Sequence, residues 1–186
     1  MVPLSSLVLP ILLSAVLVFV VSSIIHMVLG YHAGDIKAVP NDTAVQEALR
    51  PFNLEPGDYA LPKAESMAGL KDPAFLEKMN TGPVIVMTVS APGMPGMGKN
   101  LAQWFAYSLL VSLFAAYIAS RALGPGAGYL DVFRFAGTTA FAGYSLGLMQ
   151  QSIWWKKNWG ATLRSMFDGL VFALLTAGAM GWLWPR

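Results

Sequence analysis

The chain has 186 residues, of which 55% are hydrophobic and 12% are charged, with a net charge of +2 and no cysteine. A soluble domain carries about 25% charged residues, so this composition favours a protein whose surface is largely solvated by lipid. The small net charge and the lack of a dense Lys/Arg run argue against nucleic-acid binding, and the absence of cysteine excludes disulfides, thiolate metal sites and Cys nucleophiles.

The first apolar run covers residues 4–29, and His26 is its one ionisable residue. At about 1.5 Å per residue, a helix over this run is longer than the ~30 Å hydrocarbon core. A secretory signal is the alternative, but no Lys or Arg precedes the run, and the apolar stretch exceeds the usual ~7–15 residues of a signal. We therefore predict a retained transmembrane helix over residues 4–29.

Residues 30–99 change character, because they hold six of the 12 basic residues and eight of the ten acidic ones. This concentration of charge predicts a water-exposed segment. Asn41 or Asp42 can cap a helix over residues 41–50, where Thr43 and Gln46 fit a capping box and Pro51 ends the helix.

A second helix of this segment is predicted to begin at Asp72-Pro73, with Asp as the N-cap and Pro at the first helical position. The apolar, β-branched run over residues 83–89 predicts a strand. Residues 57–61 are a candidate partner strand. A segment of about 70 residues has only a thin core, so it is expected to depend on the membrane part or on a partner for stability.

Three further apolar runs predict spanning helices over residues 101–122, 132–155 and 165–184. Trp and Tyr residues flank these runs, as is typical of membrane interfaces. The fourth run is short, which places Asp168 near the membrane boundary. The sequence thus predicts an all-α membrane protein: a four-helix transmembrane bundle with a small α+β water-exposed insertion between helices 1 and 2.

Small residues recur every fourth position in the last three predicted spans, and this spacing keeps each set on one helix face. Such stripes let helix backbones approach closely in lipid, although small residues are also common in membrane helices in general. The predicted packing residues are Ser108, Ser112 and Ala116, then Gly143 and Gly147, then Gly169, Ala173, Ala177 and Gly181.

His26 is the residue of the first span with functional potential, because an ionisable group within a membrane helix is costly unless it has a role. It shares a face with Ser22 and Ser23. We expect His26 to hydrogen-bond to a serine or to reach the headgroups, with metal ligation or proton relay as the alternative.

A metal site is the second interpretation of the polar residues near the end of the first span and of the linker methionines. Its candidate ligands are His26, His32, Asp35, Met94 and Met97. If the first helix continued past Gly30, His26 would lie about 120° from His32, so no ready chelate is predicted. The thioethers of the linker methionines would favour Cu(I). Asp131, Arg134 and Asp168 are expected to have boundary roles, as a surface ion pair and as helix-start acids.

Several short segments of the chain resemble bacterial multi-pass membrane proteins that have no assigned function. The segments are SSIIHMVL at 22–29 followed by YH at 31–32, GP at 82–83, MTV at 87–89, MGK at 97–99, SIW at 152–154 and GWLWPR at 181–186. This resemblance covers most of the chain and implies a protein of the bacterial plasma (inner) membrane. It implies no activity, because none of these segments is a catalytic motif.

The sequence favours a structural or accessory membrane protein, a subunit or partner of a larger membrane complex. The alternative is a copper- or small-solute-handling protein that uses His26, His32 and the linker methionines. No nucleophile elbow, Walker loop or zincin motif is present, so an enzyme is disfavoured and no cofactor is implied. Expected partners are the lipid bilayer and other membrane subunits or a second copy, and the uncharged N-terminal tail with Lys37 favours a cytoplasmic side for residues 30–99.

Overall fold

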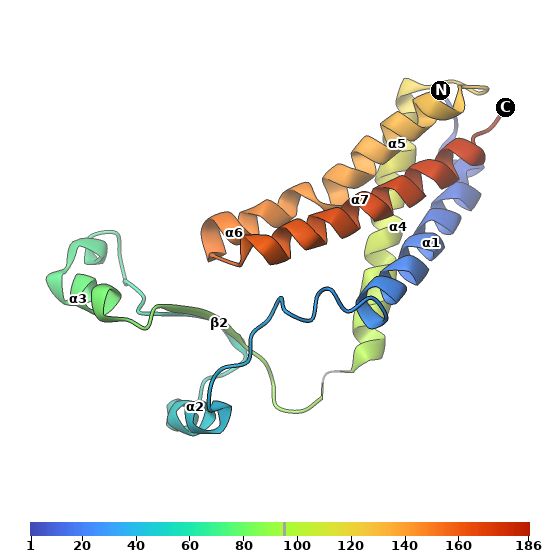
Figure 1. Ribbon diagram of the computed structural model, residues 1–186. Coiled ribbons are helices and arrows are strands. Elements are labelled where there is room, and N and C mark those ends of the chain that lie inside the picture. The colour runs from blue at the N-terminus through green and yellow to red at the C-terminus, as the bar shows by residue number, and fades with distance from the viewer. Residues whose placement is uncertain (95) are drawn as a thin grey trace. The chain divides into compact units, whose positions relative to one another are not determined.

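The computed structural model describes residues 1–94 and 96–186 (Figure 1). The chain divides into two units, which are described separately. Residues 1–37 and 96–186 form the first, called here the helical unit, and residues 38–95 form the second, called the small unit.

The helical unit contains five α-helices: α1 (Val8–Met27), α4 (Met97–Ala122), α5 (Tyr129–Tyr144), α6 (Met149–Trp155) and α7 (Trp159–Trp182). A short 3-10 turn (Leu4–Leu7) leads into α1. Helix α5 packs most extensively against α7, α1 packs against both α4 and α7, and α4 also packs against α5. Both chain termini lie at the same end of this unit (Figure 1).

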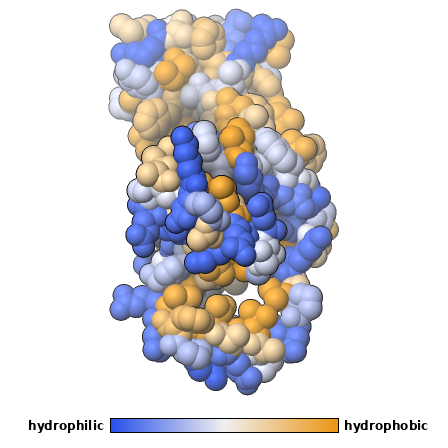
Figure 2. Space-filling view, turned by 90° about the vertical axis from the view of Figure 1, so that its left-hand side faces the viewer, coloured by the Kyte–Doolittle hydropathy of each residue, from blue (hydrophilic) through white to orange (hydrophobic). Residues whose placement is uncertain are grey.

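Three helical segments are long and apolar enough to cross a membrane: Leu4–Met27, Met97–Ala122 and Trp159–Trp182. Many of their large apolar side chains lie on the outside, as Leu110, Phe114 and Leu174 do at 51%, 55% and 48% exposure. This exposed apolar surface fits solvation by lipid tails. In Figure 2, hydrophilic and hydrophobic residues mix at the end where the termini lie, and a band of mainly hydrophobic residues lies directly below them. The prediction of a mainly helical chain with helices suited to span a membrane is confirmed in this form.

The third predicted span, residues 132–155, is not one continuous helix. It is divided into α5, a 3-10 turn (η4, Leu146–Leu148) and α6. The α-helical hydrogen-bond ladder breaks at Ser145, whose φ is −120° and whose hydroxyl donates to the carbonyl of Met166 on α7 at 3.1 Å. Serine and glycine are weak helix formers, and an uncharged run carries no information about helix continuity. A bundle of four unbroken transmembrane helices is therefore not what the structure contains.

The predicted small residues lie at helix contacts in α4 and α7. Ser108, Ser112 and Ala116 of α4 are fully buried, as are Gly169, Ala173 and Ala177 of α7. A Cβ added to Gly181 would lie 2.8 Å from the Tyr129 ring, and one added to Gly143 would lie 3.1 Å from Val111. Gly147 differs, because it belongs to η4 and faces open space.

The described residues of the small unit form two α-helices, α2 (Asp42–Leu49) and α3 (Pro73–Thr81), and two strands, β1 (Gly57–Leu61) and β2 (Ile85–Val89). The strands pair antiparallel, with Gly57 opposite Val89 and Leu61 opposite Ile85. Both helices and both strands lie where the sequence predicted them. The Asp72 carboxylate accepts from the Ala74 amide at 3.0 Å, as expected of an N-cap.

The predicted capping box of α2 does not form. Asn41 has a positive φ of 50° and caps nothing with its side chain, and the Thr43 amide donates to Asp42 Oδ1 at 2.8 Å. Because Asn tolerates the left-handed region, Asn41 begins the helix as a turn residue. The side-chain pairing that a capping box needs is therefore replaced by a local bond to Asp42.

Candidate functional site

A tight turn after α1 positions the polar residues of the candidate site. Gly30 adopts a φ of +63°, which glycine reaches without steric cost. Backbone bonds from Ala33 to Gly30 (3.0 Å) and from Asp35 to His32 (2.9 Å) then close the turn. The helix does not continue past Gly30, and the turn places His32 and Asp35 against α7.

His32 lies between two carboxylates. Its Nδ1 is 2.6 Å from Oδ2 of Asp35, and its Nε2 is 2.7 Å from Oδ2 of Asp168 on α7. Burial acts against the charged imidazole, but the hydrogen bonds and negative charges of Asp35 and Asp168 together outweigh it and raise the pKa of His32 above its usual value. In the imidazolium form, both ring N–H groups donate to a carboxylate.

Asp168 is the most buried member of this cluster, with 2% of its surface exposed. One of its oxygens accepts from His32, and the other, Oδ1, accepts from the hydroxyl of Tyr31. Burial and the adjacent carboxylate raise the pKa of Tyr31 to about 12, so its hydroxyl stays a donor. A buried carboxylate is tolerated only when it is paired and hydrogen-bonded, and the turn after α1 supplies both partners.

Asp35 links the turn to α7 a second time through Arg164. The guanidinium donates to Oδ1 of Asp35 through Nε at 2.8 Å and also through a terminal nitrogen. The hydrogen bond from His32, and then those from Arg164, hold the pKa of the Asp35 carboxyl below its usual range. With His32 protonated, the two carboxylates therefore face one imidazolium and one guanidinium, and the four charges cancel.

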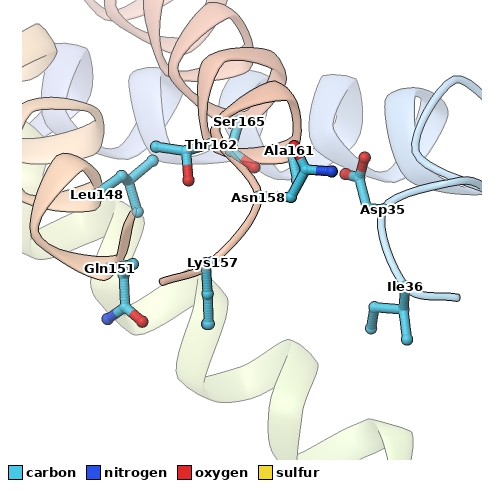
Figure 3. A pocket seen from close by; sticks show the side chains of 9 residues that line it. All are labelled: Asp35, Ile36, Leu148, Gln151, Lys157, Asn158, Ala161, Thr162 and Ser165. Atoms are coloured by element: carbon cyan, nitrogen blue, oxygen red, sulfur yellow. The ribbon is translucent and has the colours of Figure 1, made fainter. Parts of the chain in front are cut away.

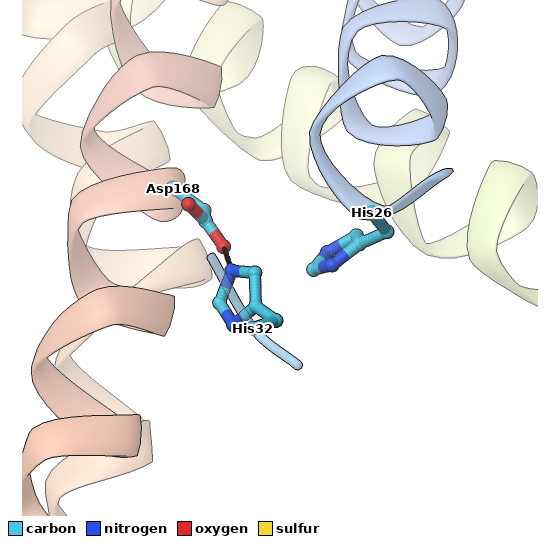
Figure 4. Close-up of side chains that lie close together, drawn as sticks. All are labelled: His26, His32 and Asp168. Atoms are coloured by element: carbon cyan, nitrogen blue, oxygen red, sulfur yellow. Dashed lines mark hydrogen bonds and ion pairs between the residues drawn. The ribbon is translucent and has the colours of Figure 1, made fainter. Parts of the chain in front are cut away.

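His26 completes the cluster at the end of α1. Its ring centroid lies 4.8 Å from that of His32, at an interplanar angle of 45° (Figure 4). One potential ligand atom from each of His26, His32 and Asp168 lies within 4.8 Å of the other two. Unlike His32, His26 has an exposed side chain and no side-chain hydrogen bond among the described residues.

A pocket of about 470 Å³ adjoins the cluster (Figure 3). Asp35 and Ile36 line one side of it, and the other side is formed by η4, α6 and the start of α7. Gln151, Asn158 and Thr162 contribute polar groups there. Asp35 therefore belongs to both the pocket and the cluster.

Two expectations from the sequence need correction. His26 was expected to bond to a serine or to reach the headgroups, and the bond to serine is absent, because both serine hydroxyls donate to the carbonyl of Phe19, at 2.9 and 2.8 Å. Serine hydroxyls in a helix commonly donate to a backbone carbonyl of the preceding turn. The His26 ring is therefore not bound to these serines and lies beside His32. The separation predicted for His26 and His32 also fails, since it assumed a helix that continues past Gly30.

Asp168 was expected to have only a boundary role, yet it accepts two hydrogen bonds from the turn after α1. A sequence signal for this contact exists. Arg164 and Asp168 lie one turn apart on one helix face. Asp35 has the charge opposite to that of Arg164, and a protonated His32 has the charge opposite to that of Asp168. The expected surface pair of Asp131 and Arg134 is present at 3.6 Å, and both side chains are more than half exposed.

The two candidate methionine ligands lie outside this cluster's residues. Met94 belongs to the small unit and is 98% exposed. Met97 begins α4 and is 67% exposed. Among the described residues, the side chains that come together as potential metal ligands are the imidazoles of His26 and His32 and the carboxylate of Asp168.

Comparison of the chain with family models, with curated proteins and with solved structures gave no match. A function can therefore be proposed only from the geometry of this molecule. Two features carry such a proposal: the unburied apolar surface of the small unit and the histidine cluster at the end of α1.

Proposed function

We propose that this protein is an accessory subunit of a larger complex in the bacterial plasma membrane, with no catalytic activity of its own. Its helical unit anchors the chain in the bilayer, and its small unit binds a protein partner. The observation that carries the proposal is that the small unit has no core. None of the described residues from 38 to 94 is buried.

The small unit instead exposes large apolar side chains. On its two strands and the residue before β2, Leu61, Val84, Ile85 and Val86 are 48%, 53%, 37% and 50% exposed, and Phe52 is 70% exposed. A unit of this size that buries so little apolar surface gains too little free energy to offset the entropy of ordering its chain. Its strands and helices are expected to become stable when this surface is covered.

A protein partner suits this surface better than lipid does. Acidic residues outnumber basic ones within residues 38–94. Membrane surfaces rich in anionic lipid attract basic segments and repel acidic ones. Mixed apolar and charged surfaces are instead typical of protein interfaces, which have an apolar centre and a polar rim.

The proposal includes four membrane crossings, with the α5–α6 segment as the third. This segment follows α7 along its length: Tyr129 lies against Gly181 at one end, Gly137 against Ala177 further along, and the hydroxyls of Ser152 and Thr162 are 2.7 Å apart at the other end. A segment that packs along a spanning helix from end to end crosses the same thickness of the membrane. The break begins at Ser145, which is buried and bonded to α7. None of the η4 residues is buried, so a span here requires a partner or a water-filled cavity beside η4, since irregular backbone is tolerated at membrane depth only in such places.

Single-cysteine labelling tests the partner. We expect Val86→Cys in β2 to react at least about tenfold more slowly with a maleimide in native membranes than in the purified protein, because a partner covers the strand. Glu65→Cys, on an exposed polar position of the same unit, is the matched control and should react equally in both. Native cysteine does not interfere, since the chain has none.

The same two variants in liposomes that contain only the purified protein separate the alternatives. Fast labelling of Val86→Cys in liposomes supports a protein partner that is lost on purification. Slow labelling in liposomes would show that lipid covers the strand. Slow labelling already in detergent would show that the chain's own helices cover it, and either result would contradict the accessory role as proposed.

A further inference from the structure

The cluster at the end of α1 has a feature that anchoring and partner binding do not require. His26, His32 and Asp168 direct potential ligand atoms to one place from two elements far apart in the chain (Figure 4). We propose that these three side chains bind a divalent transition-metal ion, with Zn²⁺ as the representative, and that a solvent ligand completes the coordination. This site is independent of the partner proposed for the small unit.

The spacing of the ligand atoms fits such an ion after small movements. Ligand atoms around a tetrahedral zinc ion are about 3.4 Å apart, given metal–ligand distances of about 2.0–2.2 Å. Nε2 of His32 and Oδ2 of Asp168 are 2.7 Å apart, and the three ligand atoms lie within 4.8 Å of one another. The His26 ring can adjust, because none of the described residues holds it by a hydrogen bond.

The groups around the ligands are those that metal sites require. A ligating histidine usually donates its second ring N–H to a carboxylate, which fixes the ring and raises the basicity of the ligating nitrogen. Nδ1 of His32 faces Asp35 at 2.6 Å, and Arg164 in turn holds Asp35. The Tyr31 hydroxyl occupies Oδ1 of Asp168 and leaves Oδ2 directed at His32. Each supporting contact points the ligating atom toward the shared space.

The donor set selects the class of metal. Two imidazoles and one carboxylate suit borderline divalent ions such as Zn²⁺, whereas Cu(I) prefers the soft thioethers and thiolates of Met and Cys. Three protein ligands with a fourth position open to solvent is a common zinc arrangement. The exposure of His26 leaves that side of the site accessible to water.

Zinc binding to the purified full-length protein tests the site. The protein should carry an affinity tag without histidine, and metal should first be removed with a chelator. We expect one equivalent of Zn²⁺ to bind in competition with a chromophoric chelator. His26→Gln should weaken this binding by more than about tenfold, because it removes one ligand and leaves the hydrogen bonds of His32 and Asp168 in place.

Two further variants and a spectrum complete the test. Asp35→Asn should weaken binding by about 10–100-fold, the usual effect of altering a supporting carboxylate, and the control Asp131→Asn should change nothing. X-ray absorption at the zinc edge should show only nitrogen and oxygen ligands. The proposal is overturned if no stoichiometric zinc binds, if His26→Gln binds as tightly as the unaltered protein, or if sulfur ligands appear.

Discussion

Replacing Asp168 with alanine is expected to lower the free energy of unfolding by about 3–5 kcal/mol, the usual cost of removing one partner from a buried charged network. Asp168 is 2% exposed and accepts from both Tyr31 and His32. Without it, the Tyr31 hydroxyl and one N–H of His32 lose their acceptor, and the turn after α1 keeps its link to α7 through Asp35 and Arg164 but loses the one through Asp168.

The matched control is Asp131→Ala. Asp131 is also paired with a cation, Arg134, at 3.6 Å, but the two side chains are 58% and 70% exposed. Exposed ion pairs contribute about 0–1 kcal/mol, so this variant should lose less than about 1 kcal/mol. Denaturant unfolding of both purified variants in mixed micelles, with a chelator present, measures the difference. Equal losses for Asp168→Ala and Asp131→Ala would contradict the structural role assigned to the cluster.

The second large effect is expected from Gly169→Leu. Gly169 of α7 is buried against Tyr144 and Ser145, and even an added Cβ would overlap the Ser145 hydroxyl and lie 3.1 Å from the Tyr144 Cβ. Overpacking a close contact costs about 1–3 kcal/mol and sometimes more. A leucine at this position is much larger than one Cβ, so we expect α5 and α7 to separate and thermal stability in detergent to fall sharply.

Gly147→Leu is the control for this substitution. Gly147 also lies in the α5–α6 segment, but nothing is within 4 Å of a Cβ built on it. Its replacement should change the free energy of unfolding by less than about 0.5 kcal/mol, as is usual at surface positions. Thermal unfolding followed by circular dichroism compares the two. Similar melting temperatures would show that close approach of α5 and α7 is not what stabilises the helical unit.

The sequence predicted those parts of the fold that depend on local patterns. Run length and the lack of charge located α1, α4 and α7, and the Asp72-Pro73 pair located α3. The same reasoning failed at residues 132–155, because hydropathy measures whether a segment suits lipid and does not measure whether its helix is continuous. The weak helix formers Gly143, Ser145 and Gly147 within that run were the available signal for the break.

The candidate site depends on contacts between distant parts of the chain, and for that reason it was only partly predicted. His26, His32 and Asp35 were recognised as polar residues at the end of the first span. Asp168 lies 136 positions after His32, and its role required knowledge of which face of α7 meets the turn after α1. That turn depends on the positive φ of Gly30, which helical periodicity does not reveal.

The four membrane crossings that we propose can be tested by accessibility labelling of single cysteines. Ser5→Cys, Pro125→Cys and Arg186→Cys are expected to react with an impermeant maleimide from one side. Lys37→Cys and Lys157→Cys are expected to react from the other side. All five positions are exposed. If α5 and α6 do not cross, Lys157→Cys will instead be labelled from the same side as Pro125→Cys. Arg186→Cys will then be labelled from the same side as Lys37→Cys, and this result would contradict four crossings.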